Sequence, residues 1–460
     1  MKIQQPTTVN EQRTTKNGKL FSNFAGIKSP NPFWLASAPP TNSGYQVMRA
    51  FDRGWGGAVW KTLGVPIINT SSRYGAVNYR DKRMVGFNNI ELISDRPLAD
   101  NLRDIEEVKK YFPEHAVIGS LMVETKEQWH QIIRDVENAG VDGIELNFGC
   151  PHGMCERGMG SAVGQEPNVL IQIVSWVMET AKVPVIVKLT PNVSHIQEPA
   201  IAAKRGGANA VSLINTIQSI IGVDIDNFVP YPVVDGKSTN GGYCGPAVKP
   251  IAMNMVKNVA KIPGYNLPIS GIGGIENWRD AVEFILLGAT NVQVCTAVMH
   301  YGFGIIREII AGFEQYMSDK NFNSVDEMIG KALPNIMNWE ELNLNYKVIA
   351  ELDESKCIGC QLCYIACEDG AHQAIGLPQN QDSRIPHIIE ENCVGCNLCS
   401  IVCPVENCIT MVRKDENKEV INWKERTNQG NIPISFNDKL AGGIGHHIPE
   451  PKEAIAYRLK

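Results

Sequence analysis

Eight cysteines near the C-terminal end of the chain carry its clearest chemical signal. They form two runs with the same C-x2-C-x2-C-x3-C spacing: Cys357, Cys360, Cys363 and Cys367, then Cys393, Cys396, Cys399 and Cys403. This spacing is typical of bacterial proteins that bind two four-iron, four-sulfur (4Fe-4S) clusters through cysteine thiolates. Such clusters pass single electrons, so the two runs predict an electron-transfer domain.

In proteins with this spacing, the first three cysteines of a run bind one cluster and the fourth binds the other. A pair of zinc sites is the alternative, because zinc also binds thiolates. A zinc site takes four ligands, however, and does not explain the third closely spaced cysteine of each run. We therefore expect one cluster on Cys357, Cys360, Cys363 and Cys403, and the other on Cys393, Cys396, Cys399 and Cys367.

Length and composition limit the classes of protein to consider. The chain has 460 residues and a formal net charge of −6, which suits two or three domains with a large core. The polar N-terminus does not resemble a signal peptide, and no apolar run approaches the roughly 20 residues that span a bilayer. Dispersed basic residues predict neither nucleic-acid nor membrane binding. Five further cysteines follow no disulfide-like spacing, which predicts a reducing, cytoplasmic compartment: Cys150, Cys155, Cys244, Cys295 and Cys408.

Eight short apolar runs, most of them followed by a helical pattern, must position any further chemistry. Continuous Val, Ile and Leu runs are typical of strands that are buried on both faces. The runs are Phe33–Pro39, Gly57–Gly64, Ala116–Val123, Gly143–Cys150, Pro184–Thr190, Ala210–Thr216, Pro268–Ile275 and Asn291–Val298. Eight strands alternating with helices over about 300 residues predict an α/β fold, a (β/α)8 TIM barrel. A doubly wound open sheet is the alternative.

These patterns divide the chain into an N-terminal arm (1–20), a barrel (21–347), a two-cluster ferredoxin-like domain (348–412) and a C-terminal tail (413–460). Two long polar stretches, Ile67–Ser94 and Ile217–Gly245, interrupt the barrel pattern. Long loops at the C-terminal face of a barrel often carry function. In the tail, a solvated His446-His447 pair is expected rather than a metal site.

Polar side chains gather where the predicted strands end, which is where TIM-barrel active sites lie. Gly273-Gly274 ends the seventh run, where backbone amides could approach a phosphate closely. A phosphate site beside an electron-transfer domain calls for a cofactor that takes single electrons and passes on a hydride. A flavin does both, and the chain contains no G-x-G-x-x-G dinucleotide motif. Because only one phosphate site is visible, we expect FMN rather than FAD. The strand-end residues are Ser37, Lys61, Thr62, Asn147, Cys150, Lys188, Asn215, Thr216, Ile272, Cys295 and Thr296.

Cys150 ends the fourth run and opens a Gly-rich loop. A thiol at this position could give or take a proton while a flavin handles the hydride. The alternative is a small buried hydrophobic residue, which is the usual role of a free cysteine. The strand-end position beside Asn147 favours the acid–base role, and Cys155, further along the loop, is the weaker candidate. Lys61 and Lys188 are expected to contact flavin or phosphate.

Several of these residues, taken together, resemble the motifs of a known family. The chain looks like the pyrimidine-reducing subunits of NAD-dependent dihydropyrimidine dehydrogenases and, more broadly, like dihydroorotate dehydrogenase barrels. The resemblance covers roughly residues 21–412 and includes both cysteine runs. It rests on Pro32-Phe33, Gly54-Trp55-Gly56, Lys61-Thr62, Asn147, Cys150-Pro151-His152-Gly153, Gly164-Gln165, Lys188-Leu189-Thr190-Pro191-Asn192, Asn215-Thr216 and Gly273-Gly274.

The resemblance implies a set of roles in uracil or thymine reduction. Cys150 would protonate C5 of the pyrimidine as a hydride from FMN reaches C6. Asn147 would touch both flavin and substrate, and Asn215 and Thr216 would hold the pyrimidine. A partner subunit with FAD and an iron–sulfur centre would oxidise NAD(P)H and form a hetero-oligomer with this chain. FMN would be surrounded by Ser37, Lys61, Thr62, Asn147, Lys188, Gly245, Ile272, Gly273, Gly274, Cys295 and Thr296.

Two positions depart from the family pattern. Thr125 stands near the place of a usual asparagine, where we expect it to contact substrate, and Gly149 replaces the usual serine before the cysteine. Lost polar contacts reduce discrimination among substrates, so another cyclic amide or conjugated carbonyl compound is an alternative substrate. Two further alternatives are a dihydroorotate oxidase and a non-enzymatic electron-transfer module whose barrel is a scaffold.

Overall fold

The computed structural model describes residues 18–68, 70–151, 158–378, 384–414 and 419–428. The chain divides into two compact units on either side of Asn335, Met1–Asn335 and Ile336–Lys460. Within the described ranges, no helix is long and apolar enough to cross a membrane. Cys155, His446, His447, most of the N-terminal arm and most of the C-terminal tail lie outside the described residues.

The first unit is a closed barrel of eight parallel strands, which confirms the predicted (β/α)8 fold. Each apolar run of the sequence contains one strand, and nearly every residue of these strands is buried. The strands are β3 (Phe33–Leu35), β4 (Gly57–Val59), β7 (Ala116–Leu121), β8 (Gly143–Asn147), β9 (Val185–Lys188), β10 (Ala210–Leu213), β15 (Ile269–Ile272) and β16 (Asn291–Val294).

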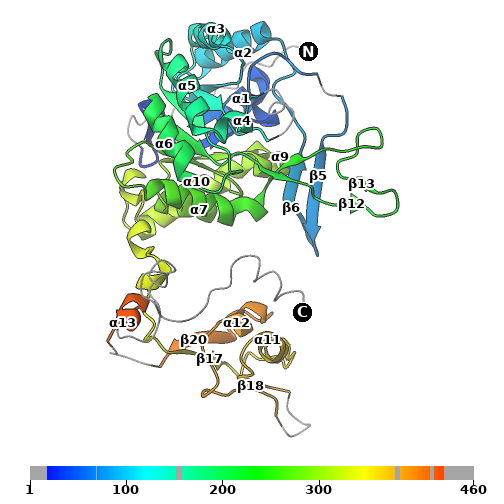
Figure 1. Cartoon of the computed structure of the whole chain (residues 1–460), viewed down its shortest axis with the longest axis vertical. Helices are drawn as coiled ribbons and strands as arrows, with labels where there is room; N and C mark the ends of the chain where they lie inside the picture. Colours follow the sequence, from blue (N-terminus) through cyan, green and yellow to red (C-terminus); the bar gives the residue numbers. More distant parts are fainter. Residues whose placement is uncertain (1–17, 69, 152–157, 379–383, 415–418, 429–460) are drawn as a thin grey trace, which may run out of the picture. The chain divides into compact units, whose positions relative to one another are not determined.

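Eight longer helices follow the strands and surround the barrel (Figure 1). Helix α3 shows how the sequence builds them: Thr125 caps its N-terminus, and Trp129, Ile132, Ile133 and Val136 are buried at helical spacing. The helices are α1 (Gly44–Arg53), α2 (Leu98–Tyr111), α3 (Lys126–Asn138), α5 (Pro167–Met178), α6 (Gln197–Gly206), α7 (Lys249–Ala260), α8 (Trp278–Leu286) and α10 (Ile306–Asp319).

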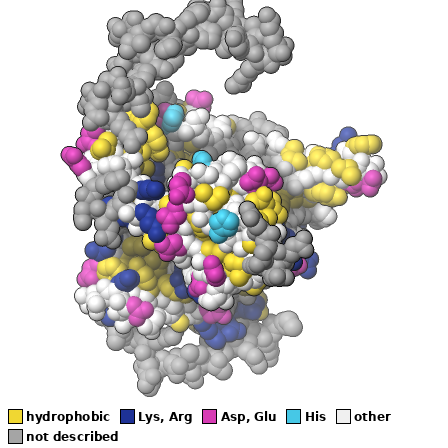
Figure 2. Space-filling view, turned by 90° about the horizontal axis from the view of Figure 1, so that it is seen from below, with side chains coloured by type: hydrophobic (Ala, Val, Ile, Leu, Met, Phe, Trp, Pro, Cys, Tyr) yellow, Lys and Arg dark blue, Asp and Glu magenta, His cyan; other side chains and the backbone are white. Residues whose placement is uncertain are grey.

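The two long stretches that interrupt the barrel pattern pair with each other in a second, antiparallel sheet. This sheet has the order β11-β14-β6-β5 and joins β5 (Tyr74–Tyr79) and β6 (Lys82–Asn89) to β11 (Ile217–Ser219) and β14 (Gly241–Cys244). Between β11 and β14, the short strands β12 (Val223–Asp224) and β13 (Val229–Pro230) form a projecting arm (Figure 1). Apolar side chains gather on this projection, at the right of Figure 2, where Ile225 is 80% and Phe228 83% exposed.

The second unit repeats a small motif. Helix α11 (Leu362–Gly370) begins one residue before the third cysteine of the first run, and helix α12 (Leu398–Val402) begins one residue before the third cysteine of the second. Strand β17 (Val348–Leu352) pairs with β20 (Ile409–Arg413), and β18 (Ile375–Gly376) pairs with β19 (His387–Ile388). Cys363, Cys367 and Cys399 are buried in the core of this unit, so cysteines supply part of its apolar interior.

Candidate active site

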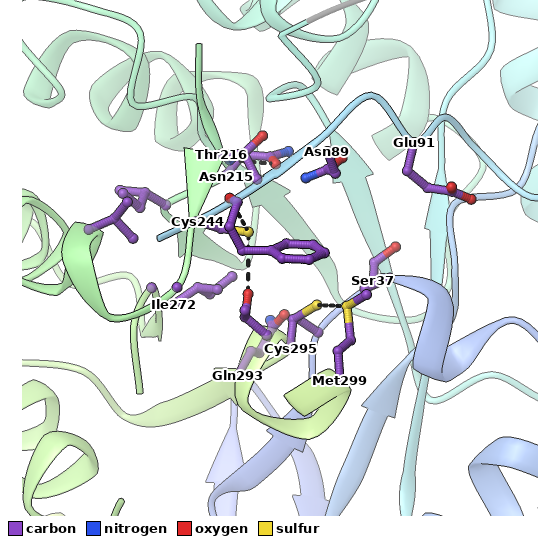
Figure 3. A pocket seen from close by; sticks show the side chains of 18 of the residues that line it. Ser37, Asn89, Glu91, Asn215, Thr216, Cys244, Ile272, Gln293, Cys295 and Met299 are labelled. Atoms are coloured by element: carbon purple, nitrogen blue, oxygen red, sulfur yellow. Dashed lines mark hydrogen bonds between the residues drawn. The ribbon is translucent and has the colours of Figure 1, made fainter. Parts of the chain in front are cut away.

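A pocket opens at the C-terminal ends of the barrel strands and gathers almost every residue singled out from the sequence (Figure 3). Strands of a parallel barrel all end at one face, so residues far apart in the chain converge there. The predicted residues that line the pocket are Ser37, Lys61, Thr62, Asn147, Cys150, Lys188, Asn215, Thr216, Gly245, Ile272, Gly273, Gly274, Cys295 and Thr296.

A chain of hydrogen bonds holds the two asparagines of the pocket in fixed positions. Asn215 donates from Nδ2 to Oδ1 of Asn147 at 3.0 Å, and Asn147 donates from Nδ2 to Oγ1 of Thr62 at 3.0 Å. The Thr62 hydroxyl also contacts the hydroxyls of Ser37 at 3.2 Å and Ser120 at 2.9 Å. Each amide has two N–H donors, so one N–H of each asparagine is left for a planar amide ligand.

Gly149 lies directly against Asn215. A Cβ atom at position 149 would stand 2.3 Å from Cβ and 2.5 Å from Nδ2 of Asn215, which is too close for any side chain. The serine that the family resemblance led us to expect at this position therefore does not fit this arrangement. The absence of that hydroxyl follows from the close approach of Asn215, which itself lines the pocket.

Lys61 and Lys188 each meet a carboxylate at the pocket. Lys61 pairs with Glu91, which also accepts a hydrogen bond from Arg73 at 2.9 Å. Lys188 Nζ lies 3.7 Å from Oε1 of Glu145, which is fully buried in the barrel interior. Burial acts to raise the pKa of Glu91, but the hydrogen bonds and charges of Lys61 and Arg73 outweigh it and hold the pKa below its ordinary value.

The other end of the pocket has the geometry of an anion site. Gly273 and Gly274 have φ angles of 130° and 73°, in the left-handed region that favours glycine. A Cβ on Gly274 would meet the Gly245 carbonyl oxygen at 2.9 Å, so this position has no room for a side chain. Thr296 begins helix α9 (Thr296–Tyr301). These features suit a phosphate group held by backbone amides.

Two cysteines near this end are thiols rather than thiolates. Burial raises the pKa of Cys295 to about 12 and that of Cys244 to about 11. The Thr296 hydroxyl donates to Cys244 Sγ at 3.2 Å, and Cys295 Sγ donates to Met299 Sδ at 3.7 Å (Figure 3). Both side chains therefore add neutral, polarisable surface to the pocket.

Cys150 follows β8 and is 8% exposed. It packs in a small apolar cluster with Ile93, Met122 and Met159, and it lines the pocket together with Asn147. The thiol is therefore largely shielded from bulk water but faces the space in which a ligand would bind. A positioned thiol in such a place could act as a general acid.

In the second unit, the eight cysteines of the two runs divide between two cavities. Each cavity takes three cysteines from one run and the fourth cysteine from the other, as their spacing predicts. We call the cavity lined by Cys357, Cys360, Cys363 and Cys403 the first cavity, and the cavity lined by Cys393, Cys396, Cys399 and Cys367 the second cavity.

Comparison with known proteins agrees with this architecture. A family model described as dihydroorotate dehydrogenase matches residues 19–317, and one described as a 4Fe-4S dicluster domain matches residues 350–411. The chain belongs to the dihydroorotate dehydrogenase family. Its barrel thus carries a family fold, and the 4Fe-4S dicluster domain follows it in the same chain.

Several named relatives cover most of the chain. The chain is 43% identical over 366 residues to the NAD-dependent dihydropyrimidine dehydrogenase subunit PreA of Escherichia coli (strain K12), across 79% of this chain and 88% of the relative. It is 44% identical to the chloroplastic dihydropyrimidine dehydrogenase (NADP(+)) of Arabidopsis thaliana, across 67% of this chain and 75% of the relative. It is 36% identical to the catalytic subunit of dihydroorotate dehydrogenase B (NAD(+)) of Pyrococcus abyssi, across 68% of this chain and 98% of the relative.

One predicted site residue of this dihydroorotate dehydrogenase-family barrel does not reach the pocket. Thr125 is exposed and caps helix α3, where its hydroxyl accepts a hydrogen bond from the Gln128 backbone N–H at 3.3 Å. In return, the Thr125 backbone N–H donates a hydrogen bond to Oε1 of the Gln128 side chain at 3.0 Å. A capping box is a helix-start motif, so the structure corrects the expectation that Thr125 contacts a substrate.

The structure also adds pocket residues that sequence reasoning missed. Asn89, Glu91 and Cys244 line the pocket, and all three come from the two stretches that interrupt the barrel pattern. Pairing of β6 with β14 sets Asn89 opposite Gly242 and brings these stretches together over the barrel. The available signal was the polar, aromatic composition of residues 67–94, which indicates a functional loop but not which side chains point inward.

Proposed function

We propose that this chain reduces a neutral pyrimidine, uracil or thymine, to its 5,6-dihydro form with electrons that arrive through two 4Fe-4S clusters. The observation that carries the proposal is the pocket that joins Cys150 to the hydrogen-bonded pair Asn147 and Asn215. Two relatives named as dihydropyrimidine dehydrogenases, at 43% and 44% identity, support the same assignment.

The proposed cofactor is FMN. The Gly273-Gly274 backbone with its positive φ angles suits the phosphate, and Thr62, Lys188, Ile272, Cys295 and Thr296 line the space beyond it. FMN supplies the conversion between single electrons and a hydride. Lys188, fixed by Glu145, places a positive charge at the pocket.

The chain's own residues position the pyrimidine and supply its proton. Asn147 and Asn215 hold each other and offer their remaining N–H groups to the carbonyl oxygens of the pyrimidine, while Thr216 adds a neighbouring hydroxyl. Cys150 holds the proton destined for C5, and its burial keeps water from competing. Proton delivery and hydride delivery to C6 then saturate the 5,6 double bond.

Electrons must come from outside this chain. We propose a partner subunit that oxidises NAD(P)H with FAD and an iron–sulfur centre and forms a hetero-oligomer with this chain in the cytoplasm. In support, the Escherichia coli relative is named as a subunit of an NAD-dependent enzyme, and this sequence contains no dinucleotide-binding glycine motif. The 4Fe-4S clusters bound in the two cavities would carry the electrons from the partner subunit to FMN.

Oxidation of dihydroorotate is the second candidate function, favoured by the Pyrococcus abyssi relative. Dihydroorotate carries a carboxylate that needs a cationic partner. Of the described residues that line the pocket, only Lys61 and Lys188 are cationic, and each already pairs with a carboxylate, Glu91 or Glu145. The described part of the pocket therefore favours a neutral ring.

An anaerobic half-reaction separates these candidates. The purified full chain, with FMN and iron measured, is reduced chemically and mixed separately with uracil, thymine and orotate. We expect the flavin absorbance to return with uracil or thymine and a stoichiometric dihydropyrimidine to form. Reoxidation of the flavin by orotate alone would support the second candidate function, oxidation of dihydroorotate. Reoxidation by none of them in a fully loaded protein would contradict both.

A further inference from the structure

A fifth cysteine lies in the first cavity. Cys408 is 2% exposed and lines this cavity with the four expected cluster ligands. It shares the cavity lining with Cys357 and Cys403, and its thiol donates a hydrogen bond to the carbonyl oxygen of Asp353 at 3.7 Å. A four-iron cluster is already complete with four cysteines, so Cys408 is left as a thiol beside it.

The second cavity provides an internal comparison, because the two halves of this unit repeat. Ile409 pairs with Leu352, and Ile375 pairs with Ile388. Each of these partners lies five residues before the first cysteine of a run. The two pairings are therefore equivalent positions of the repeated motif.

Cys408 directly precedes Ile409, and Ala374 directly precedes Ile375. Ala374 is 3% exposed and lines the second cavity, as Cys408 lines the first. The repeat thus places a thiol beside one cluster site and a methyl group at the matching position beside the other. His372 also lines the second cavity, but it is exposed.

Two hydrogen bonds to predicted ligand sulfurs in the described part of the second cavity come from the backbone. In the second cavity, the Ala374 N–H donates to Cys367 Sγ at 3.3 Å and the Ala350 N–H donates to Cys393 Sγ at 3.4 Å. Cys408 differs because its donor is a side chain, which can be replaced without changing the backbone. In this structure its single hydrogen is donated to the Asp353 carbonyl, and an anionic sulfur of a cluster bound in the first cavity would be the stronger acceptor.

We infer that the Cys408 thiol donates a hydrogen bond to the cluster of the first cavity and raises its reduction potential. Reduction adds negative charge to the cluster, and a donor directed at its sulfurs stabilises the added charge. The inference rests on the proposed cluster ligation, and it identifies Cys408 as a residue that tunes one cluster selectively.

The test is a redox titration of the anaerobic full chain, followed by electron paramagnetic resonance of the reduced clusters. Cys408→Ala removes the donor, Cys408→Ser retains a hydroxyl donor, and Ala374→Cys adds a thiol to the second cavity. We expect Cys408→Ala to lower one midpoint only. At the wild-type midpoint, the ratio of reduced to oxidised cluster should fall by roughly two- to tenfold, as for the loss of one hydrogen bond.

Cys408→Ser should keep that midpoint close to wild type, and Ala374→Cys should raise the other one. Unchanged midpoints in Cys408→Ala at full iron content would overturn the inference. If Cys408→Ala loses iron, the redox titration of Ala374→Cys becomes the test. An unchanged midpoint for the cluster of the second cavity in that variant would also overturn the inference. A wild-type content well below about eight irons, four for each cluster, would instead contradict the proposed ligation.

Discussion

Lys188 Nζ stands 3.7 Å from Oε1 of Glu145, and Glu145 is fully buried inside the barrel. The other carboxylate oxygen, Oε2, accepts hydrogen bonds from Ser212 at 2.8 Å and from Gln293 at 3.1 Å. Among the described residues, Oε1 has no hydrogen-bond partner, so Lys188 is the group that compensates its charge. The positive charge that Lys188 places at the pocket therefore depends on the buried carboxylate of Glu145.

Removing either partner should destabilise the barrel, because a buried charge without its partner is costly. We expect Glu145→Ala to lower the free energy of unfolding by about 3–5 kcal/mol, measured by urea denaturation with tryptophan fluorescence. Glu179→Ala is the matched control, because Glu179 is 49% exposed and its partner Lys126 37% exposed, so loss of this pair should change the free energy of unfolding by less than about 1 kcal/mol. Equal stability of wild type and Glu145→Ala would show that Lys188 does not need this partner.

Cys150→Ala should retain FMN and iron but lose most turnover. A general acid contributes about 10²–10⁴-fold to rate, so reoxidation of the reduced flavin by uracil should slow by that factor. Chemical reduction of the flavin in the same variant should be unaffected, which separates the proton step from electron delivery. A variant that reoxidises at the wild-type rate would show that another group supplies the proton.

Gly149→Ser should weaken substrate binding. The new Cβ would displace Asn215, whose Cβ is 2.3 Å from that position, and break its 3.0 Å hydrogen bond to Asn147. We expect KM for the pyrimidine to rise by about tenfold, the effect of roughly one lost hydrogen bond, with FMN content unchanged.

Thr125→Ala is the control for that experiment. Thr125 caps helix α3 outside the pocket, so its loss should leave KM unchanged and lower the stability by about 1 kcal/mol. A rise in KM for Thr125→Ala would contradict the position of Thr125 outside the pocket, and a wild-type KM for Gly149→Ser would contradict the placement of Asn215 as the substrate-holding side chain.

The ion pairs of Glu91 with Lys61 and Arg73 predict that the folded state loses stability in acid. Its pKa lies below the ordinary 4.5, because Lys61 and Arg73 outweigh the effect of burial. A carboxyl group with a depressed folded pKa stabilises the folded state above the unfolded pKa, and this contribution is lost as pH falls through the folded pKa. The melting temperature of wild type should therefore exceed that of Glu91→Gln at pH 6, and the difference should shrink below about pH 4.5. A difference that stays constant from pH 6 to pH 3 would contradict this ion pairing.

The sequence by itself determined the features that depend on local order. The apolar runs predicted the eight barrel strands because strands buried on both faces require continuous apolar residues. The spacing of the cysteine runs predicted which thiols share a cavity, because a cluster sets the distances between its ligands. The ends of the runs predicted the pocket residues, because parallel strands of a barrel end at a common face.

Only the tertiary structure decided the contacts between distant segments. The pairing of β6 with β14 brings Glu91 and Cys244 to the pocket, and this pairing depends on strand register rather than on local composition. Thr125 was expected at the pocket because it stands near the place of a usual asparagine in the family that the chain resembles, but a local capping box turns its hydroxyl to helix α3. The partnership of Glu145 with Lys188 arises because barrel closure sets inward-facing side chains of neighbouring strands against each other, which the one-dimensional pattern does not contain.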